Sequence, residues 1–167
     1  MAITSTGDSS PSPAISSSVS ATAALQASSS STPTTATIHC NTVAADQRMN
    51  FLPRVFGHQY MLPGETAVFN WMAEICPDYH GGCWDFIDLS NGGFYLRLIT
   101  DSPMDIVVDS NGFSGTLSPD AAGIVATLFA LNDLLWRGAT HLHDAFYLLR
   151  DLAAEHPEGR LILQAID

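Results

Sequence analysis

The residues of this chain that are best suited to chemistry gather in one short stretch. Cys76, His80 and Cys83 lie close together, and thiolate sulfur and imidazole nitrogen are the ligands that zinc prefers in structural sites. Cys40 and His39 could complete such a site. The spacing lacks the paired Cys-x-x-Cys motifs of known zinc sites, so it favours buried or incidental thiols beside a Gly-Gly turn. A metal-dependent or thiol hydrolase that uses Cys76, His80 and Cys83 is the alternative interpretation.

Two further groups of residues are weaker candidates for a functional site. Ser114 precedes a helical pattern, as a nucleophile elbow does, but the G-x-S-x-G spacing is absent and the preceding strand is predicted to be antiparallel. We therefore expect Ser114 in a loop that positions the helix. His141 and His143 are two residues apart and do not share a helix face, which is typical of exposed histidines. The sequence contains no phosphate-binding loop or dinucleotide fingerprint. It predicts no catalytic residue, no cofactor and no metal.

The stretch that must position the rest of the chain covers residues 114–135. Ser118 is a favoured N-cap residue, Pro119 suits the first helical position, and Asp120 in the first turn complements the helix dipole. Residues 121–130 carry no charge, and a helix that is apolar around most of its circumference needs cover from several sides. The pattern predicts a buried central helix.

Three runs of alternating residues predict strands. Asn-Gly-Gly between the first two runs is typical of a hairpin. Phe94 and Leu96 fall on one face of the second strand, and Tyr95 and Arg97 fall on the other, which we expect to be exposed. Arg97 is then expected near Asp105 or Asp109. The prediction is a three-stranded antiparallel meander over residues 84–90, 94–100 and 104–109.

Helical patterns flank these strands at residues 65–76, 142–155 and 157–165. Residues 48–57 contain Pro53, which forbids a regular helix, so we expect an extended arm there. The predicted fold class is α+β, with a small antiparallel sheet of three strands, or slightly more, packed against about four helices, of which the central one is buried.

Composition divides the chain in two. Residues 1–44 are rich in Ser, Thr, Ala and Pro and cannot bury enough apolar surface to offset chain entropy, so they are predicted to form a disordered tail. Residues 45–167 are predicted to form the single folded domain.

The charge of the chain is strongly negative. Among 167 residues there are 17 acidic and 6 basic ones, for a net charge of −11, and every basic residue is Arg. Such a chain repels phosphates, so direct binding to nucleic acid or an anionic membrane is not expected, whereas a protein partner with a basic surface is favoured. Three cysteines suit a reducing cytosol better than a disulfide framework.

One predicted helix concentrates acidic residues on its outer face. Asp144, Asp151 and Glu155 recur at helical spacing, with Arg150 beside them. A solvated helix face is the ordinary interpretation of such a pattern. These four residues are also the candidate patch for binding a protein partner.

Several stretches, in order, resemble the KlcA/ArdB family of antirestriction proteins. The resemblance covers most of the chain from Arg48 onward. The stretches that carry it are RMNFLPRVFG (48–57), WMAEICPDYHGGCWDFIDLSNGGFYL (71–96), FSGTLSPDAAGIVATLFALN (113–132), and LLRDLAAEHPEG with the final AID (148–167).

The resemblance implies a function. Members of this family protect plasmid or phage DNA that enters a bacterium from type I restriction-modification enzymes of the host, and they are not enzymes. It therefore implies a bacterial cytoplasmic protein whose partner is the type I complex, with no cofactor. Dense DNA mimicry is disfavoured because the acidic residues are scattered, whereas duplex DNA carries a charge every ~1.7 Å along its axis. A non-catalytic module for plasmid maintenance is a further alternative.

Overall fold

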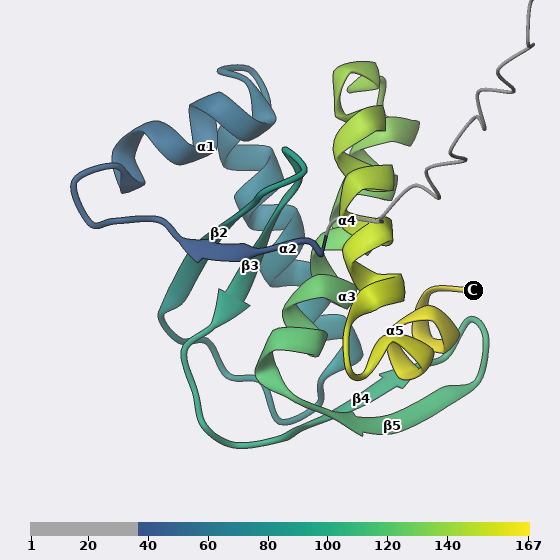
Figure 1. The fold of residues 1–167 in the computed structure, drawn as a ribbon. Coiled ribbons are helices and arrows are strands. Elements are labelled where there is room, and N and C mark those ends of the chain that lie inside the picture. The colour runs from purple at the N-terminus through teal and green to yellow at the C-terminus, as the bar shows by residue number, and fades with distance from the viewer. Residues whose placement is uncertain (1–36) are drawn as a thin grey trace, which may run out of the picture. The chain divides into compact units, whose positions relative to one another are not determined.

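The structure, a computed structural model, describes residues 37–167 (Figure 1). The described chain has an α+β fold, as predicted. Its elements, in order, are β1 (Cys40–Thr42), α1 (Arg48–Phe56), α2 (Met61–Ile75), β2 (Trp84–Leu89), β3 (Phe94–Leu98), β4 (Met104–Val108), β5 (Phe113–Leu117), α3 (Pro119–Trp136), the 3-10 helix η1 (Thr140–Leu142), α4 (His143–Glu155) and α5 (Gly159–Ile166).

The boundary of the folded domain differs from the expected one. Most of the tail predicted over residues 1–44 lies outside the described residues. Where the two overlap, residues 40–42 form β1, which pairs with β2. Pairing with β2 makes residues 40–42 part of the folded domain, although their composition alone groups them with the tail.

The strands form two antiparallel sheets, so the predicted meander is wrong. One sheet has the order β1-β2-β3, and the other pairs β4 with β5. The hairpin between β2 and β3 is confirmed, with Gly92 of its turn at φ 94°. β4 does not continue that sheet, because it forms its own hairpin with β5. Ser114 therefore lies in a strand, opposite Val107, and not in the expected loop.

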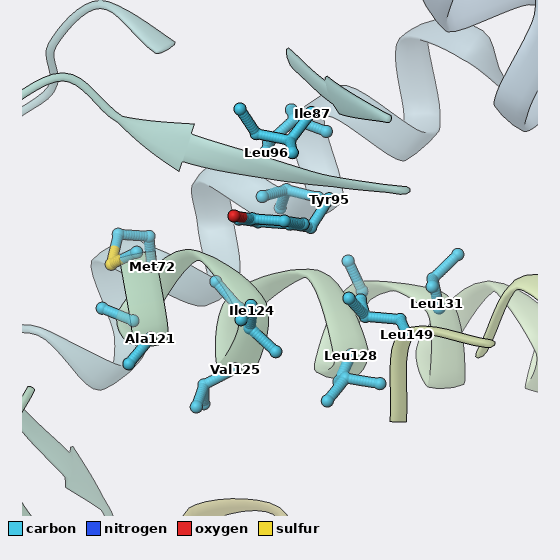
Figure 2. Close-up of a cluster of buried hydrophobic side chains, with 14 of the residues drawn as sticks. Met72, Ile87, Tyr95, Leu96, Ala121, Ile124, Val125, Leu128, Leu131 and Leu149 are labelled. Atoms are coloured by element: carbon cyan, nitrogen blue, oxygen red, sulfur yellow. The ribbon is translucent and has the colours of Figure 1, made fainter. Parts of the chain in front are cut away.

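The buried central helix is confirmed as α3. The hydroxyl of Ser118 caps it by accepting a hydrogen bond from the Ala121 N–H at 3.2 Å. α3 packs closely along β3, since a Cβ atom on Gly123 would lie 2.4 Å from the carbonyl oxygen of Leu96. Figure 2 shows the ring of Tyr95 between β3 and α3. Both faces of β3 are therefore covered, and Tyr95, which was expected on an exposed face, is fully buried.

The first helix replaces the extended arm that was predicted. α1 continues through Pro53. Within it, Phe51 stacks on Phe86 with ring centroids 4.7 Å apart, and Phe56 meets Phe94 edge-on at 5.0 Å. An interior proline costs ~3 kcal/mol, whereas burying each Phe side chain contributes about 1.5–3 kcal/mol. Tertiary burial of two aromatic rings thus offsets the local penalty.

The other helices follow the predicted pattern with shifted ends. α2 begins at Met61, earlier than predicted, because Pro63 is tolerated in a first helical turn. α4 and α5 bury the expected apolar faces, including Leu149 and Ile162. Figure 1 shows α4 beside α3 and α5 near the β4–β5 hairpin. No helix within residues 37–167 is long and apolar enough to cross a membrane.

Candidate partner-binding surfaces

The candidate patch on α4, hereafter the α4 acidic face, lies in the open. Asp144, Arg150, Asp151 and Glu155 all occupy exposed positions. Asp144, Asp151 and Glu155 share one helix face because they are separated by two turns and then by one. The side chain of Asp144 is 93% exposed. The predicted clustering of carboxylates on an outer face is thus present in the helix.

Two members of the α4 acidic face make contacts with other parts of the chain. Glu155 Oε2 accepts a hydrogen bond from the backbone N–H of Ile38 at 3.2 Å. Arg150 Nη2 lies 3.4 Å from Asp167 Oδ1, so the arginine partly neutralises the C-terminal end. Asp151 has no hydrogen bond or ion pair to any other residue in the described range. Its carboxylate is therefore available to a partner.

A second group of polar residues, which we call the Asp120 network, joins β3 to the start of α3. Asp120 Oδ1 accepts a hydrogen bond from the hydroxyl of Tyr95 at 2.7 Å and lies 3.4 Å from Arg97 Nη1. Its other oxygen lies 3.2 Å from His156 Nε2. Asp120 was identified from the sequence only as a complement to the helix dipole, and the structure adds three specific partners.

The same network corrects the expected partner of Arg97. Its guanidinium binds Asp85 Oδ2 at 3.1 Å, and Asp85 Oδ1 is also 3.6 Å from Arg48 Nη1. Asp105 and Asp109 are not its partners, because β4 belongs to the other sheet. The feature of the sequence that could have indicated this network is the presence of Tyr95 and Arg97 on one strand face, which was expected to be exposed.

The network also fixes the tautomer of His156. Its Nδ1 accepts a hydrogen bond from the backbone N–H of Glu158 at 3.0 Å, so the neutral ring carries its proton on Nε2 and donates it to Asp120. The Glu158 carboxylate accepts hydrogen bonds from the backbone N–H of Ser118, at 2.9 Å, and from the Ser118 hydroxyl. The turn between α4 and α5 is thereby tied to the start of α3.

These contacts set the ionisation of the network. Burial alone raises the pKa of Asp120, but hydrogen bonds from His156 and Tyr95 and the charge of Arg97 outweigh burial and lower that pKa. Burial and the neighbouring Asp120 carboxylate raise the pKa of Tyr95 far above its ordinary range. The result is an ionised carboxylate held between a neutral phenol, an imidazole and a guanidinium, which is an arrangement suited to joining elements.

The predicted alternative site is not assembled. Cys76 is buried, and burial raises the pKa of its thiol, which keeps it protonated and weakly nucleophilic. His80 and Cys83 are exposed. Across residues 37–167 no three His, Cys, Asp or Glu side chains are grouped so that they could hold a metal ion. Cys40 lies on β1, where its thiol neighbours the hydroxyl of Tyr95.

The two candidate histidines near the start of α4 make unrelated contacts. His141 Nε2 is 2.8 Å from the backbone carbonyl of Phe56, so it fastens the end of α1 to the η1 segment. His143 is exposed and contacts its neighbour Asp144 at 3.3 Å. Neither histidine joins a set of ligands in the described chain.

A groove of about 940 Å³, which is not among the predicted sites, lies between α2, the end of β4 and the end of α3, and we call it the α2–β4 groove. Its walls include Leu62, Trp71 and Val107. The signal in the sequence was Val107, an apolar residue on the outward face of a strand.

Comparison with known proteins places this fold in a family. Residues 77–167 match the model of the antirestriction protein family. The antirestriction protein KlcA of Escherichia coli is 50% identical over 132 residues, which cover 75% of this chain and 90% of KlcA. An uncharacterised Escherichia coli K12 protein, YafX, is 36% identical over 130 residues, which cover 75% of this chain and 85% of YafX.

A solved structure agrees over the same region. It matches with a TM-score of 0.74 and 44% identity, and it covers 78% of this chain and 95% of that one. That structure comes from work on KlcA and ArdB, which reports a novel fold and antirestriction activity against type I DNA restriction systems in vivo but not in vitro. Sequence, family model and fold all agree, and the chain belongs to the antirestriction protein family.

Proposed function

We propose that this protein inhibits type I restriction-modification enzymes of a bacterial host and thereby protects plasmid or phage DNA that enters the cell. The observation that carries the proposal is the match to KlcA along 90% of its length at 50% identity. The match covers 75% of this chain, so the proposal concerns the fold as a unit and not one short motif.

We infer that the protein acts by contacting a protein, and not by replacing DNA. A dense mimic of duplex DNA needs free carboxylates in rows, at one charge per ~1.7 Å of axis. Here Asp85, Asp88, Asp120 and Asp133 are each paired with an arginine. Pairing offsets the charge of these carboxylates, and the other acidic residues are scattered along the chain and do not form continuous rows.

The reported behaviour of the relatives supports the same inference. A mimic that fills a DNA-binding channel needs only the enzyme, so it would inhibit in a purified reaction. KlcA and ArdB are described as active in vivo but not in vitro. A contact that depends on an assembly or state present only in the cell accounts for that difference.

We assign the contact to the α4 acidic face, defined above. It is exposed, it belongs to a helix anchored by the buried Leu149 and Leu152, and it presents Asp151 without an internal partner in the described chain. Carboxylates on a rigid helix suit a basic protein surface, such as the surface with which an enzyme holds DNA. Inhibition by contact requires no catalytic group, and the role is that of an inhibitor and not of an enzyme.

The experiment is phage plating on a host with a type I system. Cells that carry this gene should plate unmodified phage more efficiently than cells without it, and the gene should have no effect in a host that lacks the system. If the gene changes plasmid retention in both hosts but leaves plating unchanged, the protein serves plasmid maintenance and the proposal is wrong.

The α4 acidic face is tested by the double substitution Asp151→Ala with Glu155→Ala. We expect the variant to fold, because both positions are exposed, and to lose protection. The matched control is Asp78→Ala with Asp101→Ala, which makes the same change in net charge at exposed positions elsewhere. Full protection by the first variant, or equal loss in both, removes the α4 acidic face as the contact.

A further inference from the structure

We propose that the α2–β4 groove binds an extended segment of the partner protein, in which apolar side chains alternate with Lys or Arg. The inference rests on the proposed function, because it names a second contact through which the inhibitor holds its target. The occupant would add to β4 as a further strand, with its apolar side chains against α2.

The position of the groove along β4 indicates an extended occupant. Val107 and Val108 both line it, together with Asp109 and Ser110. Successive side chains of a strand point to opposite faces, so a groove lined by both valines reaches the edge of β4 at its C-terminal end, where Asp109 and Ser110 continue the chain. Among the described strands β4 pairs with β5 alone, which leaves that edge without a strand partner. An unpaired edge is a template for strand addition.

The walls of the groove are apolar and accessible. Leu62 is 61% exposed and Val107 is 37% exposed, so both side chains are accessible to a partner. Trp71, on the same side of α2, is held in place by stacking on Phe129 with ring centroids 4.7 Å apart. A rigid aromatic wall beside exposed aliphatic residues is the composition of a binding groove, because burial of these side chains drives association.

The charge of the groove selects a basic occupant. Arg137 is its basic residue, and that guanidinium is occupied by Asp133 at 2.8 Å. Glu74 and Asp109 line the same groove, and within residues 37–167 no cation pairs with either of them. A second copy of this chain, with a net charge of −11 and no Lys, would place like charges together. A partner segment with Lys or Arg would be attracted to these carboxylates, whereas a second copy would be repelled by them.

The test fills the groove from one face of α2. Thr66 and Asn70 are exposed, lie one helical turn apart and line the groove, so Thr66→Arg with Asn70→Arg adds bulk and positive charge without burying either. The control is Gln59→Arg with Ala73→Arg, which adds the same charge at exposed positions outside the groove.

We expect the groove variant to lose protection in phage plating by ~10-fold or more, the change that ~1.4 kcal/mol of binding free energy produces. The control should protect as the wild type does, and both should unfold at the wild-type temperature. If the wild type protects and the groove variant protects equally, the groove inference is wrong while the proposed function stands. If the wild type itself gives no protection, the proposed function is wrong.

A peptide probe tests the chemistry of the occupant directly. A short peptide of alternating Val and Lys should shift the backbone amide signals of residues 107–110 in NMR spectra of the whole protein, and the groove variant should abolish these shifts. A matched Val and Glu peptide should leave the signals unchanged. Equal shifts with both peptides, no shift with either, or a dimer that the groove variant dissociates would each overturn the proposal.

Discussion

The hydroxyl of Thr127 accepts a hydrogen bond from the backbone N–H of Leu96 across 3.2 Å, and this bond joins the buried face of α3 to the edge of β3. An edge strand needs a partner for its backbone groups, and another strand usually supplies it. Here a side chain of α3 supplies an acceptor for one of these groups, on the last strand of the sheet. Gly123, one turn earlier, makes the approach possible because it has no Cβ.

Replacing Thr127 with Val should destabilise the protein by about 1–3 kcal/mol, because it leaves the buried N–H of Leu96 without an acceptor while the volume stays the same. Thr127→Ser retains the hydroxyl and should cost less. Urea denaturation followed by circular dichroism measures both. A Val variant as stable as the wild type would show that the bond does not stabilise the fold.

Gly123→Ala should also destabilise the protein, against the trend of helix propensity. Ala is ~1 kcal/mol more favourable than Gly inside a helix. However, the new Cβ would lie 2.4 Å from the backbone oxygen of Leu96, so α3 and β3 must separate, and strain of this kind costs about 1–3 kcal/mol. A lower midpoint of thermal unfolding is expected. Asn132→Ala, at an exposed position of α3, is the control and should not lower the midpoint.

The Asp120 network should make stability depend on pH in the acid range. Because the folded-state pKa of Asp120 is lowered, its contribution is fully present above the ordinary Asp pKa of 3.8 and is lost as the pH falls from there through the folded value. Asp120→Asn should be less stable at neutral pH and should lose less stability on acidification. The free energy of unfolding, measured in urea between neutral and acid pH, checks the sign.

A conservative variant separates the hydrogen bond of Tyr95 from the charge of the network. Tyr95→Phe removes one donor to Asp120, so the pKa of Asp120 should rise and the acid dependence should weaken without vanishing. NMR titration of the Asp120 carboxyl measures this directly. An unchanged pKa would mean that His156 and Arg97 alone hold the carboxylate ionised.

Phe51 should be among the costliest residues to truncate. It is fully buried and contacts two rings of the first sheet, Phe86 at 4.7 Å and Phe94 at 5.9 Å. Phe51→Ala should cost about 3–5 kcal/mol and loosen α1, whereas Phe51→Leu should cost less. Thermal unfolding gives the order of the two variants. Equal midpoints would contradict the role of this ring in holding α1.

Much of the fold and family followed from local patterns. Ser118 and Pro119 located the start of α3, because capping and proline geometry act within a few residues. The Asn-Gly-Gly turn located the hairpin of β2 and β3 for the same reason. The stretches that resemble KlcA and ArdB identified the family, which the comparisons confirmed. The role of the α4 acidic face stays a prediction.

The sequence alone determined which segments are helix or strand wherever the governing interactions are local, and it determined that the chain is acidic. Only the tertiary structure decided that β4 pairs with β5, that Arg97 binds Asp85 and Asp120, and that α1 is helical through Pro53. The reason is physical: side-chain alternation specifies the faces of a strand but not which strand lies at its edge. Ion pairs and aromatic contacts, likewise, depend on distances between residues far apart in the chain.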